Sequence, residues 1–358
     1  MRVAVLGAGA GGTATAFDYA AHGHEVRLFD FPGYPENIAG IAAAGAIEAS
    51  GDLEGRAPVA LATHDIAAAV DGAELLLVVG PAYSSAPFGE ALRGHLHPGQ
   101  LLLVTPGSCG GALALCRAAG TTPGDGAPCV AETSTLNYAV RLTAPGRIRV
   151  FLKLRAGNLL AALPGARTAE TLARVADVYP NMEAARNVLQ TSLQNANPVI
   201  HPAVTLANAA RIDTPGCEFL FYEEGVSDAT GRLIEALDRE RIAIGAAIGL
   251  AIIPDPQLAM RQGYMLAQDY GDAYRRAPGF RGIGAQPQLD HRYLNEDVGY
   301  GLLFMRELAR QVAVPTPSMD AVIHLVSVLT GRDYAAEAPR TPQSLGIGDL
   351  DAAALAAL

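Results

Sequence analysis

Two short stretches in the second half of the chain carry side chains suited to proton transfer and anion binding. In the first, residues 195–202 read Asn-Ala-Asn-Pro-Val-Ile-His-Pro, so two prolines interrupt a helix around His201. Because proline lacks a backbone N–H and breaks the helical ladder, we expect polar groups here to point into a nearby cavity. An imidazole changes charge near neutral pH, which makes His201 a candidate general acid or base.

The second stretch, residues 291–300, reads His-Arg-Tyr-Leu-Asn-Glu-Asp-Val-Gly-Tyr and lies just before a predicted helix. A carboxylate beside an imidazole fixes its tautomer and stabilises the imidazolium, so Asp297 is a candidate partner for a histidine. The guanidinium of Arg292 is suited to bidentate binding of a carboxylate. Simpler roles are also open. Asp297 could cap a helix that starts near Val298, and Arg292 could form an ordinary salt bridge.

The first thirty residues predict a nucleotide site that would supply a cofactor to such groups. An apolar strand, Met1–Leu6, runs into a turn with Gly-x-Gly-x-x-Gly spacing and then into an alanine-rich helix. These glycines allow a tight turn, close approach of a pyrophosphate and close packing of helix on strand, while free amides at the helix start face the phosphates. The residues predicted to bind the cofactor here are Gly7, Ala8, Gly9, Ala10, Gly11 and Gly12.

Asp30 follows the second predicted strand, Glu25–Phe29, at the place where an acidic residue holds the ribose 2′-hydroxyl. Its carboxylate would repel a 2′-phosphate, and no arginine follows it closely. NAD(H) is therefore favoured, while a loop that folds back after Asp30 would admit NADP(H). Gly80 and Pro81 follow a buried strand predicted over Ala73–Val79, and we expect them to add to the cofactor site.

The pattern of apolar residues changes near the middle of the chain. The first half alternates short strands and helices, which is typical of a Rossmann-type doubly wound α/β sheet, whereas the pattern from Met182 onward is helical. A chain of 358 residues is long enough for two domains, since single cores stop growing near roughly 250–300 residues. We predict a dinucleotide-binding domain over 1–182 and an all-α substrate domain over 183–358. Helices of the second domain are predicted at 182–193, 203–210, 229–250, 256–274, 300–312 and 319–329.

Composition and charge exclude several classes of protein. An apolar content of 50% with 17% charged residues is that of a folded globular chain. The net charge of −10 argues against a nucleic-acid partner, because binding phosphates needs a basic surface. The longest apolar run, Ile242–Ile253, is too short for a bilayer, and no signal segment precedes the first strand, so we expect a cytoplasmic protein with no membrane partner. The four cysteines have no zinc-binding spacing, and no metal is predicted.

The motifs around His201 and Arg292 resemble those of the opine dehydrogenases, the family that includes octopine dehydrogenase, and the resemblance covers nearly the whole chain. It rests on Asn197-Pro198-x-x-His201-Pro202 and on Arg292-Tyr293-Leu294-x-Glu296-Asp297. The resemblance implies that His201 and Asp297 form the catalytic pair and that Arg292 holds the carboxylate of a 2-oxo acid. Asn197 becomes a candidate substrate contact.

A third segment, residues 135–141, resembles the family's Thr-Leu-Pro-aromatic-Ala-x-Arg motif, with Asn137 in place of the proline. The resemblance implies that Thr135 helps to hold the keto acid. The implied reaction is a reductive condensation of a 2-oxo acid, usually pyruvate in this family, with the amino group of an amino acid. Both partners are small molecules, and the nicotinamide delivers hydride to the imine they form.

Two other functions fit the layout. Ketopantoate, glycerol-phosphate and hydroxy-acid dehydrogenases share it, but they use a lysine early in the second domain, whereas the single lysine here, Lys153, lies in a predicted strand of the first. A nucleotide-sensing protein without turnover would keep the glycine motif and Asp30 but would not need a His, Asp and Arg set. The tail after Tyr334 is expected either to be mobile or to cover a partner subunit, as in a homodimer.

Overall fold

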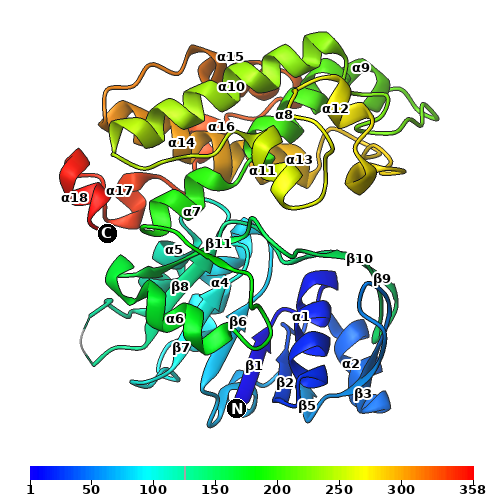
Figure 1. Ribbon diagram of the computed structural model, residues 1–358, viewed down its shortest axis with the longest axis vertical. Coiled ribbons are helices and arrows are strands. Elements are labelled where there is room, and N and C mark those ends of the chain that lie inside the picture. Colours follow the sequence, from blue (N-terminus) through cyan, green and yellow to red (C-terminus); the bar gives the residue numbers. More distant parts are fainter. Residues whose placement is uncertain (125) are drawn as a thin grey trace. The chain divides into compact units, whose positions relative to one another are not determined.

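A computed structural model describes residues 1–124 and 126–358, and these residues form two compact units (Figure 1). The first unit comprises residues 1–191 together with Leu358, and the second comprises residues 192–357. The division lies within helix α7 (Val188–Gln194), beyond the predicted boundary at residue 182. The reason is that Glu183–Ala184 pairs as strand β12 with the sheet of the first unit.

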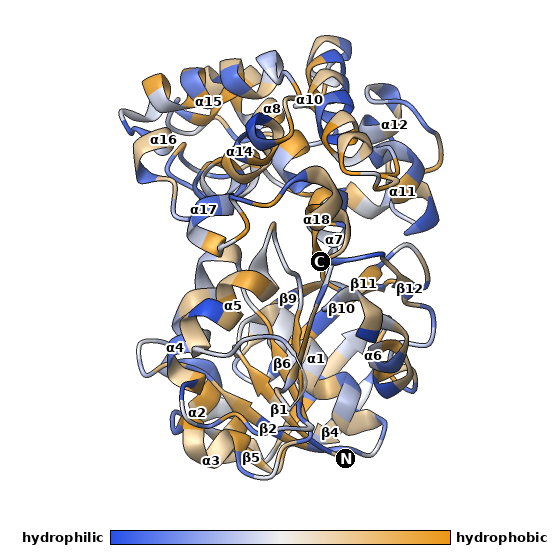
Figure 2. Cartoon of the chain, turned by 90° about the vertical axis from the view of Figure 1, so that its left-hand side faces the viewer, coloured by the Kyte–Doolittle hydropathy of each residue, from blue (hydrophilic) through white to orange (hydrophobic). Residues whose placement is uncertain are grey.

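An eight-stranded sheet forms the centre of the first unit, in the order β12-β11-β8-β7-β6-β1-β2-β5. All neighbouring strands are parallel except β11 and β8. Strands β6 and β7 are buried along their whole length, which explains their continuous apolar sequences. Figure 2 shows β6 in the orange of hydrophobic residues. The predicted doubly wound α/β fold is confirmed. The strands are β1 (Arg2–Leu6), β2 (Glu25–Phe29), β5 (Leu61–Thr63), β6 (Leu75–Val78), β7 (Leu101–Val104), β8 (Cys129–Thr133), β11 (Leu159–Leu163) and β12 (Glu183–Ala184).

A second, four-stranded sheet has the order β4-β3-β10-β9. Its strand β10 alternates buried Ile148 and Val150 with exposed Arg147 and Arg149. Its strands are β3 (Ala46–Gly51), β4 (Gly55–Pro58), β9 (Tyr138–Ala144) and β10 (Arg147–Lys153). The helices that complete the unit are α1 (Ala10–Ala21), α2 (Pro35–Ala44), α3 (Ile66–Val70), α4 (Ser85–Leu92), α5 (Gly111–Ala119) and α6 (Thr168–Val175).

The second unit is built from helices, as predicted, but several of their bounds differ. Helix α8 begins at Asn197, not at residue 203, because Pro198 in its first turn needs no helical N–H partner. The segment predicted as one helix over 256–274 is broken by Gly263, whose φ is 85°, and resumes only after Gly271. The helices are α8 (Asn197–Ala207), α9 (Ala209–Ile212), α10 (Asp228–Ala247), α11 (Asp255–Arg261), α12 (Asp272–Arg275), α13 (Arg292–Asn295), a π-helical segment (Asp297–Leu302), α14 (Leu303–Gln311), α15 (Pro317–Thr330), α16 (Tyr334–Glu337), α17 (Pro342–Leu345) and α18 (Ala352–Ala356).

One of the two predictions for the C-terminal tail was that it is mobile, and the structure differs from that prediction. It forms α16, α17 and α18, and Gln311 of α14 donates hydrogen bonds to the carbonyls of Ile347 and Leu350 at 2.8 and 2.7 Å. The guanidinium of Arg340 lies 5.2 Å from the ring centre of Tyr300. The tail is therefore packed on the helices of its own unit.

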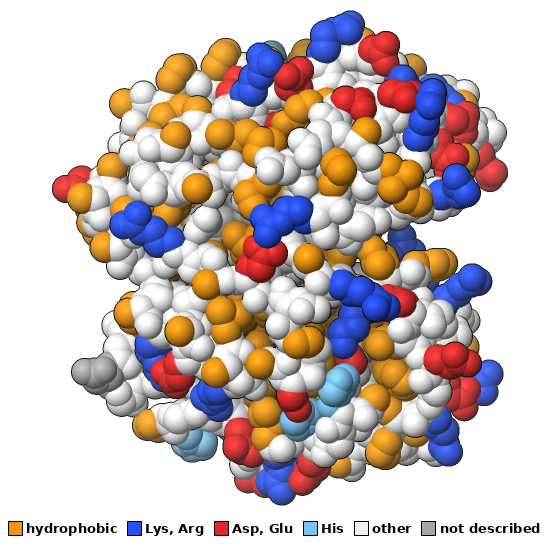
Figure 3. Space-filling view, viewed as in Figure 1, with side chains coloured by type: hydrophobic (Ala, Val, Ile, Leu, Met, Phe, Trp, Pro, Cys, Tyr) orange, Lys and Arg blue, Asp and Glu red, His pale blue; other side chains and the backbone are white. Residues whose placement is uncertain are grey.

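The surfaces of the two units carry mixed charges. On the face shown in Figure 3, acidic and basic side chains are interspersed over each unit. Within the described ranges, no helix combines the length and the apolar character that a membrane span requires.

A buried ionic cluster joins α10 and α11 in the second unit. Asp238 and Arg241 are fully buried, and Oδ1 of Asp238 lies 2.6 Å from Nη2 of Arg241. Arg241 also donates hydrogen bonds to the carbonyls of Leu193 and Ile253, while the backbone N–H of Asp255 donates to Asp238 at 3.0 Å. Because buried charges need such partners, the cluster fixes the start of α11 against α10.

Asp255 adds a second carboxyl group to this cluster, and it accepts a hydrogen bond from the hydroxyl of Tyr274. Burial raises the pKa of Asp255 to about 6, and the nearby carboxylate of Asp238 adds to the rise. The folded protein therefore holds a proton on Asp255 more tightly than the unfolded chain does.

Replacing Asp255 by Asn is expected to change how stability depends on pH. For an acid with a raised pKa, the stabilising contribution is complete below the unfolded value near 3.9 and is lost as the pH rises through about 6. A difference of that size corresponds to roughly 3 kcal/mol. Chemical denaturation should show that the free energy of unfolding of the wild type, relative to Asp255→Asn, falls by about this amount between pH 4 and pH 7.

The exposed Asp349→Asn is the matched control, and its difference from the wild type should not change with pH in this way. A wild-type to Asp255→Asn difference that is constant across the range would contradict the raised pKa.

Candidate active site

The loop between β1 and α1 has the shape that a dinucleotide pyrophosphate requires. Gly7 has a φ of 109°, and a Cβ there would lie 2.1 Å from the carbonyl oxygen of Val79. A Cβ on Gly12 would lie 1.7 Å from the carbonyl oxygen of Gly7. A Cβ on Gly9 would instead meet no atom within 4 Å, and Gly9 is the N-cap of the 12-residue helix α1. Gly7 and Gly12 thus serve the fold, and Gly9 keeps open space beside the helix amides.

The other predicted loop residues surround this space. Ala8 precedes Gly9 on the turn, and Ala10 and Gly11 are the first two residues of α1. Gly80 and Pro81 follow Val79, whose N–H donates to the carbonyl of Leu6 at 2.8 Å, so the loop after β6 starts beside the loop after β1. This arrangement brings together the cofactor-binding residues predicted from the first unit.

Asp30 is held against the same loop. Its carboxylate accepts hydrogen bonds from the backbone N–H groups of Ala8 at 2.7 Å and Phe31 at 2.8 Å, and the residue is 8% exposed. Burial raises the pKa of Asp30, and the two backbone bonds oppose that rise. An acceptor at the end of β2 is thus fixed beside the glycine turn, where a ribose hydroxyl would be bound.

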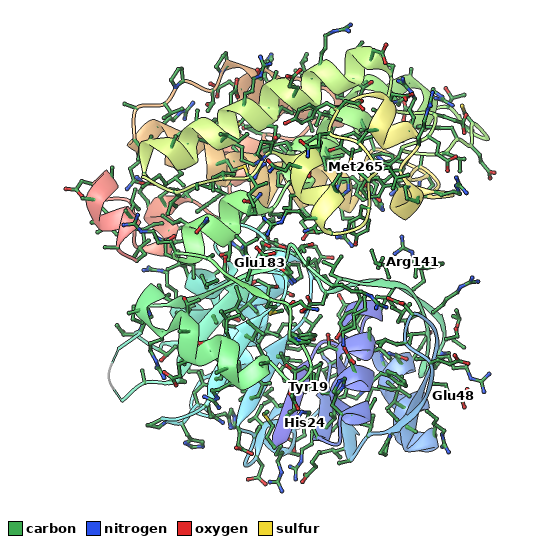
Figure 4. All side chains as sticks on the ribbon, in the orientation of Figure 1. Tyr19, His24, Glu48, Arg141, Glu183 and Met265 are labelled. Atoms are coloured by element: carbon green, nitrogen blue, oxygen red, sulfur yellow. The ribbon has the colours of Figure 1, made fainter. Side chains whose placement is uncertain are left out.

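Thr135 lies in a segment that also reaches the glycine loop. A Cβ on Gly11 would lie 2.9 Å from a methyl group of Leu136. Asn158 holds the backbone of Thr135 from both sides, accepting from its N–H at 3.2 Å and donating to its carbonyl at 2.9 Å. The side chain of Asn158 also donates a hydrogen bond to the side chain of Asn137 at 2.7 Å. Asn137, which stands where the family motif has proline, is thus bonded to the same residue that positions Thr135. The segment ends at Arg141, an exposed residue of β9 (Figure 4).

His201 and Asp297 meet inside the second unit. Nδ1 of His201 lies 2.7 Å from Oδ2 of Asp297, and the two side chains are 8% and 6% exposed. Asp297 is the first residue of the π-helical segment, and the N-cap of that segment is Glu296. The geometry therefore supports the interpretation that Asp297 pairs with a histidine, and it does not support a helix-capping role.

Close backbone packing brings these two residues together. Pro198 and Gly301 lie in contact where α8 meets the π-helical segment, and a Cβ on Gly301 would be 2.4 Å from Cγ of Pro198. π-Helical turns often occur at functional sites, and this one turns the Asp297 side chain toward α8.

Two aromatic residues around His201 were not predicted from the sequence. The hydroxyl of Tyr222 lies 3.0 Å from Nε2 of His201. The ring of Tyr293 stacks on the imidazole, with centroids 4.1 Å apart and an interplanar angle of 22°. Tyr293 lies within the motif recognised at residues 292–297, so its position was a usable signal. Tyr222 lies between helices, where no periodicity marks it.

Arg292 and Asn197 are both exposed. Arg292 opens α13 with its side chain 55% exposed, and its Nε lies 3.3 Å from Oε2 of Glu296. The salt bridge considered as its simpler role is therefore present. Asn197 is the exposed first residue of α8, and its N–H donates to the side chain of Asn195 at 3.2 Å. The structure thus joins His201 to Asp297 and Arg292 to Glu296.

A dinucleotide-binding unit followed by a helical unit with a buried histidine–aspartate pair defines a two-domain NAD(P)-dependent dehydrogenase. Residues 184–330 match the family described as NAD/NADP octopine/nopaline dehydrogenase, alpha-helical domain. The opine dehydrogenase of Arthrobacter sp. (strain 1C) is 37% identical over 356 residues, which cover 98% of this chain and 97% of that protein. The chain therefore belongs to the opine dehydrogenase family, whose members are NAD(P)-dependent oxidoreductases acting on CH–NH donors.

Solved structures share the fold over the full length. Octopine dehydrogenase with NADH and L-arginine has a TM-score of 0.80 and 20% identity, covering 97% of this chain and 96% of that one. Octopine dehydrogenase with NADH and pyruvate has a TM-score of 0.79 and 21% identity, covering 98% and 96%. Because the chain belongs to this family, the two alternatives considered above, a ketopantoate-type dehydrogenase and a nucleotide sensor, are set aside.

Gly9→Ala is expected to weaken cofactor binding without unfolding the protein. The added methyl group meets no protein atom, but it enters the space left for the pyrophosphate. We expect fluorescence titration to show at least about a tenfold loss of NADH affinity, because losing about 1.4 kcal/mol of binding free energy already has that effect. The melting temperature should be unchanged.

Gly284→Ala in the second unit is the matched control, since a Cβ there also meets no atom within 4 Å. It should leave NADH affinity unchanged. Full affinity in Gly9→Ala would show that the phosphates do not lie over this turn.

Proposed function

We propose that this protein catalyses the NAD(H)-dependent condensation of a 2-oxo acid, pyruvate in the first instance, with the amino group of an amino acid, and the reverse oxidation. The observation that carries the proposal is the buried His201–Asp297 pair in the helical unit of an opine dehydrogenase-family chain. Further support comes from the octopine dehydrogenase structures, which hold NADH with pyruvate or with L-arginine.

In this proposal His201 moves the protons of the reaction. Nε2 of the imidazole, the ring nitrogen that does not face Asp297, takes a proton from the ammonium group of the amino acid as the hydroxyl hydrogen of Tyr222 turns away from it. The lone pair of the amine can then attack the keto carbon. The imidazolium, stabilised by Asp297 at 2.7 Å, then returns the proton to the carbinolamine hydroxyl, which leaves as water. A nicotinamide cofactor, when bound, supplies the hydride that reduces the resulting imine. A positioned acid/base of this kind contributes about 10²–10⁴-fold in rate.

Arg292, Thr135 and Asn197 are proposed to hold the substrates. A guanidinium binds a carboxylate through parallel N–H donors, and the side chain of Arg292 is accessible from solvent. Its place one residue before Tyr293, which stacks on the imidazole, supports a role beside His201. The fixed backbone of Thr135 and the exposed position of Asn197 suit contacts to polar groups of the keto acid and the amino acid.

NAD(H) is the proposed cofactor, and NADP(H) is the second candidate. The glycine loop fits a pyrophosphate, since Gly9 leaves open space at the start of α1. The Asp30 carboxylate at the end of β2 would accept from the ribose hydroxyls of NAD(H) and would repel the 2′-phosphate of NADP(H).

The direct test is NADH and NADPH oxidation with pyruvate and each amino acid in turn. We expect an amine-dependent rate with at least one amino acid, and a kcat/KM for NADH at least about tenfold above that for NADPH, because a charge repulsion of about 1.4 kcal/mol gives that ratio. No amine-dependent oxidation with any 2-oxo acid would refute the proposed reaction.

Variants of the site should separate proton transfer from substrate binding. His201→Asn and Asp297→Asn should lower kcat by about 10²–10⁴-fold with little change in NADH affinity, because they remove the acid/base and its partner. Arg292→Lys should mainly raise the KM for the 2-oxo acid, since an ammonium cannot form the paired hydrogen bonds of a guanidinium. Equal effects of all three substitutions on NADH affinity would speak for misfolding instead.

A further inference from the structure

Both ring nitrogens of His201 are engaged by protein groups. Nδ1 lies 2.7 Å from Asp297, and Nε2 lies 3.0 Å from the hydroxyl of Tyr222. The proton positions follow from the chemistry of these partners. An ionised carboxylate only accepts hydrogen bonds, so Nδ1 must carry a proton, and in the neutral imidazole Nε2 is then the lone-pair nitrogen.

We propose that Tyr222 is a positioning residue, which donates its hydroxyl hydrogen to Nε2 and so holds neutral His201 as the Nδ1–H tautomer with Nε2 as the basic nitrogen. The inference rests on the proposed role of His201 in proton transfer. It adds to the histidine–aspartate pair a third group, contributed by a loop residue outside the three recognised motifs.

The surroundings of Tyr222 keep its hydroxyl at this place. The residue is 5% exposed, and its ring stacks on Phe280 with centroids 4.3 Å apart and on Tyr274 at 6.4 Å. Phe221 packs edge-on against the same ring at 5.0 Å. Burial raises the pKa of the Tyr222 hydroxyl well above its usual value, so the group stays protonated and available as a donor. A buried hydroxyl without a partner is costly, which favours the bond to Nε2.

Other titratable groups surround His201. Asp297 precedes the rest of the π-helical segment, and His291 and Tyr293 lie at the start of α13. Asp255 of α11 interacts electrostatically with His201. On α10, the opposite charges of Asp238 and Arg241 compensate each other. Helix α15 buries only apolar residues: Met319, Val322, Ile323 and Val326.

The Tyr222 oxygen also has a role once His201 is protonated. Nε2–H then becomes the donor and the hydroxyl oxygen the acceptor, with the hydroxyl hydrogen turned away. Hydrogen bonds to a charged group are about twice as strong as neutral ones, so the hydroxyl favours proton uptake by His201. Losing it should make the imidazolium harder to form.

Nitrogen-15 NMR of the histidine rings tests the tautomer directly and needs no turnover. His201→Asn identifies the signals of His201. At a pH where the ring is neutral, the wild type should show a protonated Nδ1 and an unprotonated Nε2 shifted upfield as a hydrogen-bond acceptor. In Tyr222→Phe the Nε2 signal should move to the position of an unbonded nitrogen.

Tyr264→Phe is the matched control, because it removes a hydroxyl from the same aromatic stack, 5.2 Å from Phe280, without touching His201. It should leave both nitrogen signals in place. A wild-type spectrum with the proton on Nε2 would overturn the proposal even if Tyr222→Phe failed to fold, and so would unchanged signals in a folded Tyr222→Phe.

Steady-state kinetics give a second readout. The acidic limb of the pH profile of kcat/KM is the range in which His201 is already protonated. In Tyr222→Phe this limb should move by roughly half to one pH unit toward lower pH. The KM for NADH should not change. A lower rate with an unmoved limb would mean that Tyr222 only packs. If the wild type shows no amine-dependent turnover, the proposed reaction fails while the NMR result still decides the role of Tyr222.

Discussion

The contact between Pro198 and Gly301 sets the distance across which His201 and Asp297 face each other. No Cβ fits at position 301, because it would lie 2.4 Å from the proline ring. The closeness of α8 and the π-helical segment thus depends on a residue without a side chain. Two groups 96 positions apart in the chain meet at 2.7 Å only because this backbone approach is allowed.

Aromatic rings connect two systems of buried polar groups in the second unit. Asp255 accepts a bond from Tyr274 in the ionic cluster of α10 and α11, and the ring of Tyr274 lies parallel to that of Tyr222. Tyr222 in turn bonds His201. Each polar system satisfies its own charges, as burial requires, while the rings between them hold the geometry rigid. The cluster that stabilises the helices therefore also supports the surroundings of the imidazole.

The sequence predicted those features that depend on neighbouring residues. The glycine turn, the strand that precedes Asp30 and the buried run of β6 follow from local spacing. The meeting of His201 with Asp297 was inferred from motif resemblance, because no local pattern links residues so far apart. Tyr222 could not be predicted, since a loop tyrosine gains its partner only through tertiary packing. The break at Gly263 was missed because apolar periodicity continues across it.

The single lysine of the chain is committed to the interior of the first unit. Nζ of Lys153 lies 2.7 Å from Asp18 and donates to the carbonyl of Val178 at 3.0 Å, with its side chain 22% exposed. Among the side chains of the sequence, amine-directed reagents thus find only this engaged ammonium. Coupling through side-chain amines would therefore be confined to one position of the first unit.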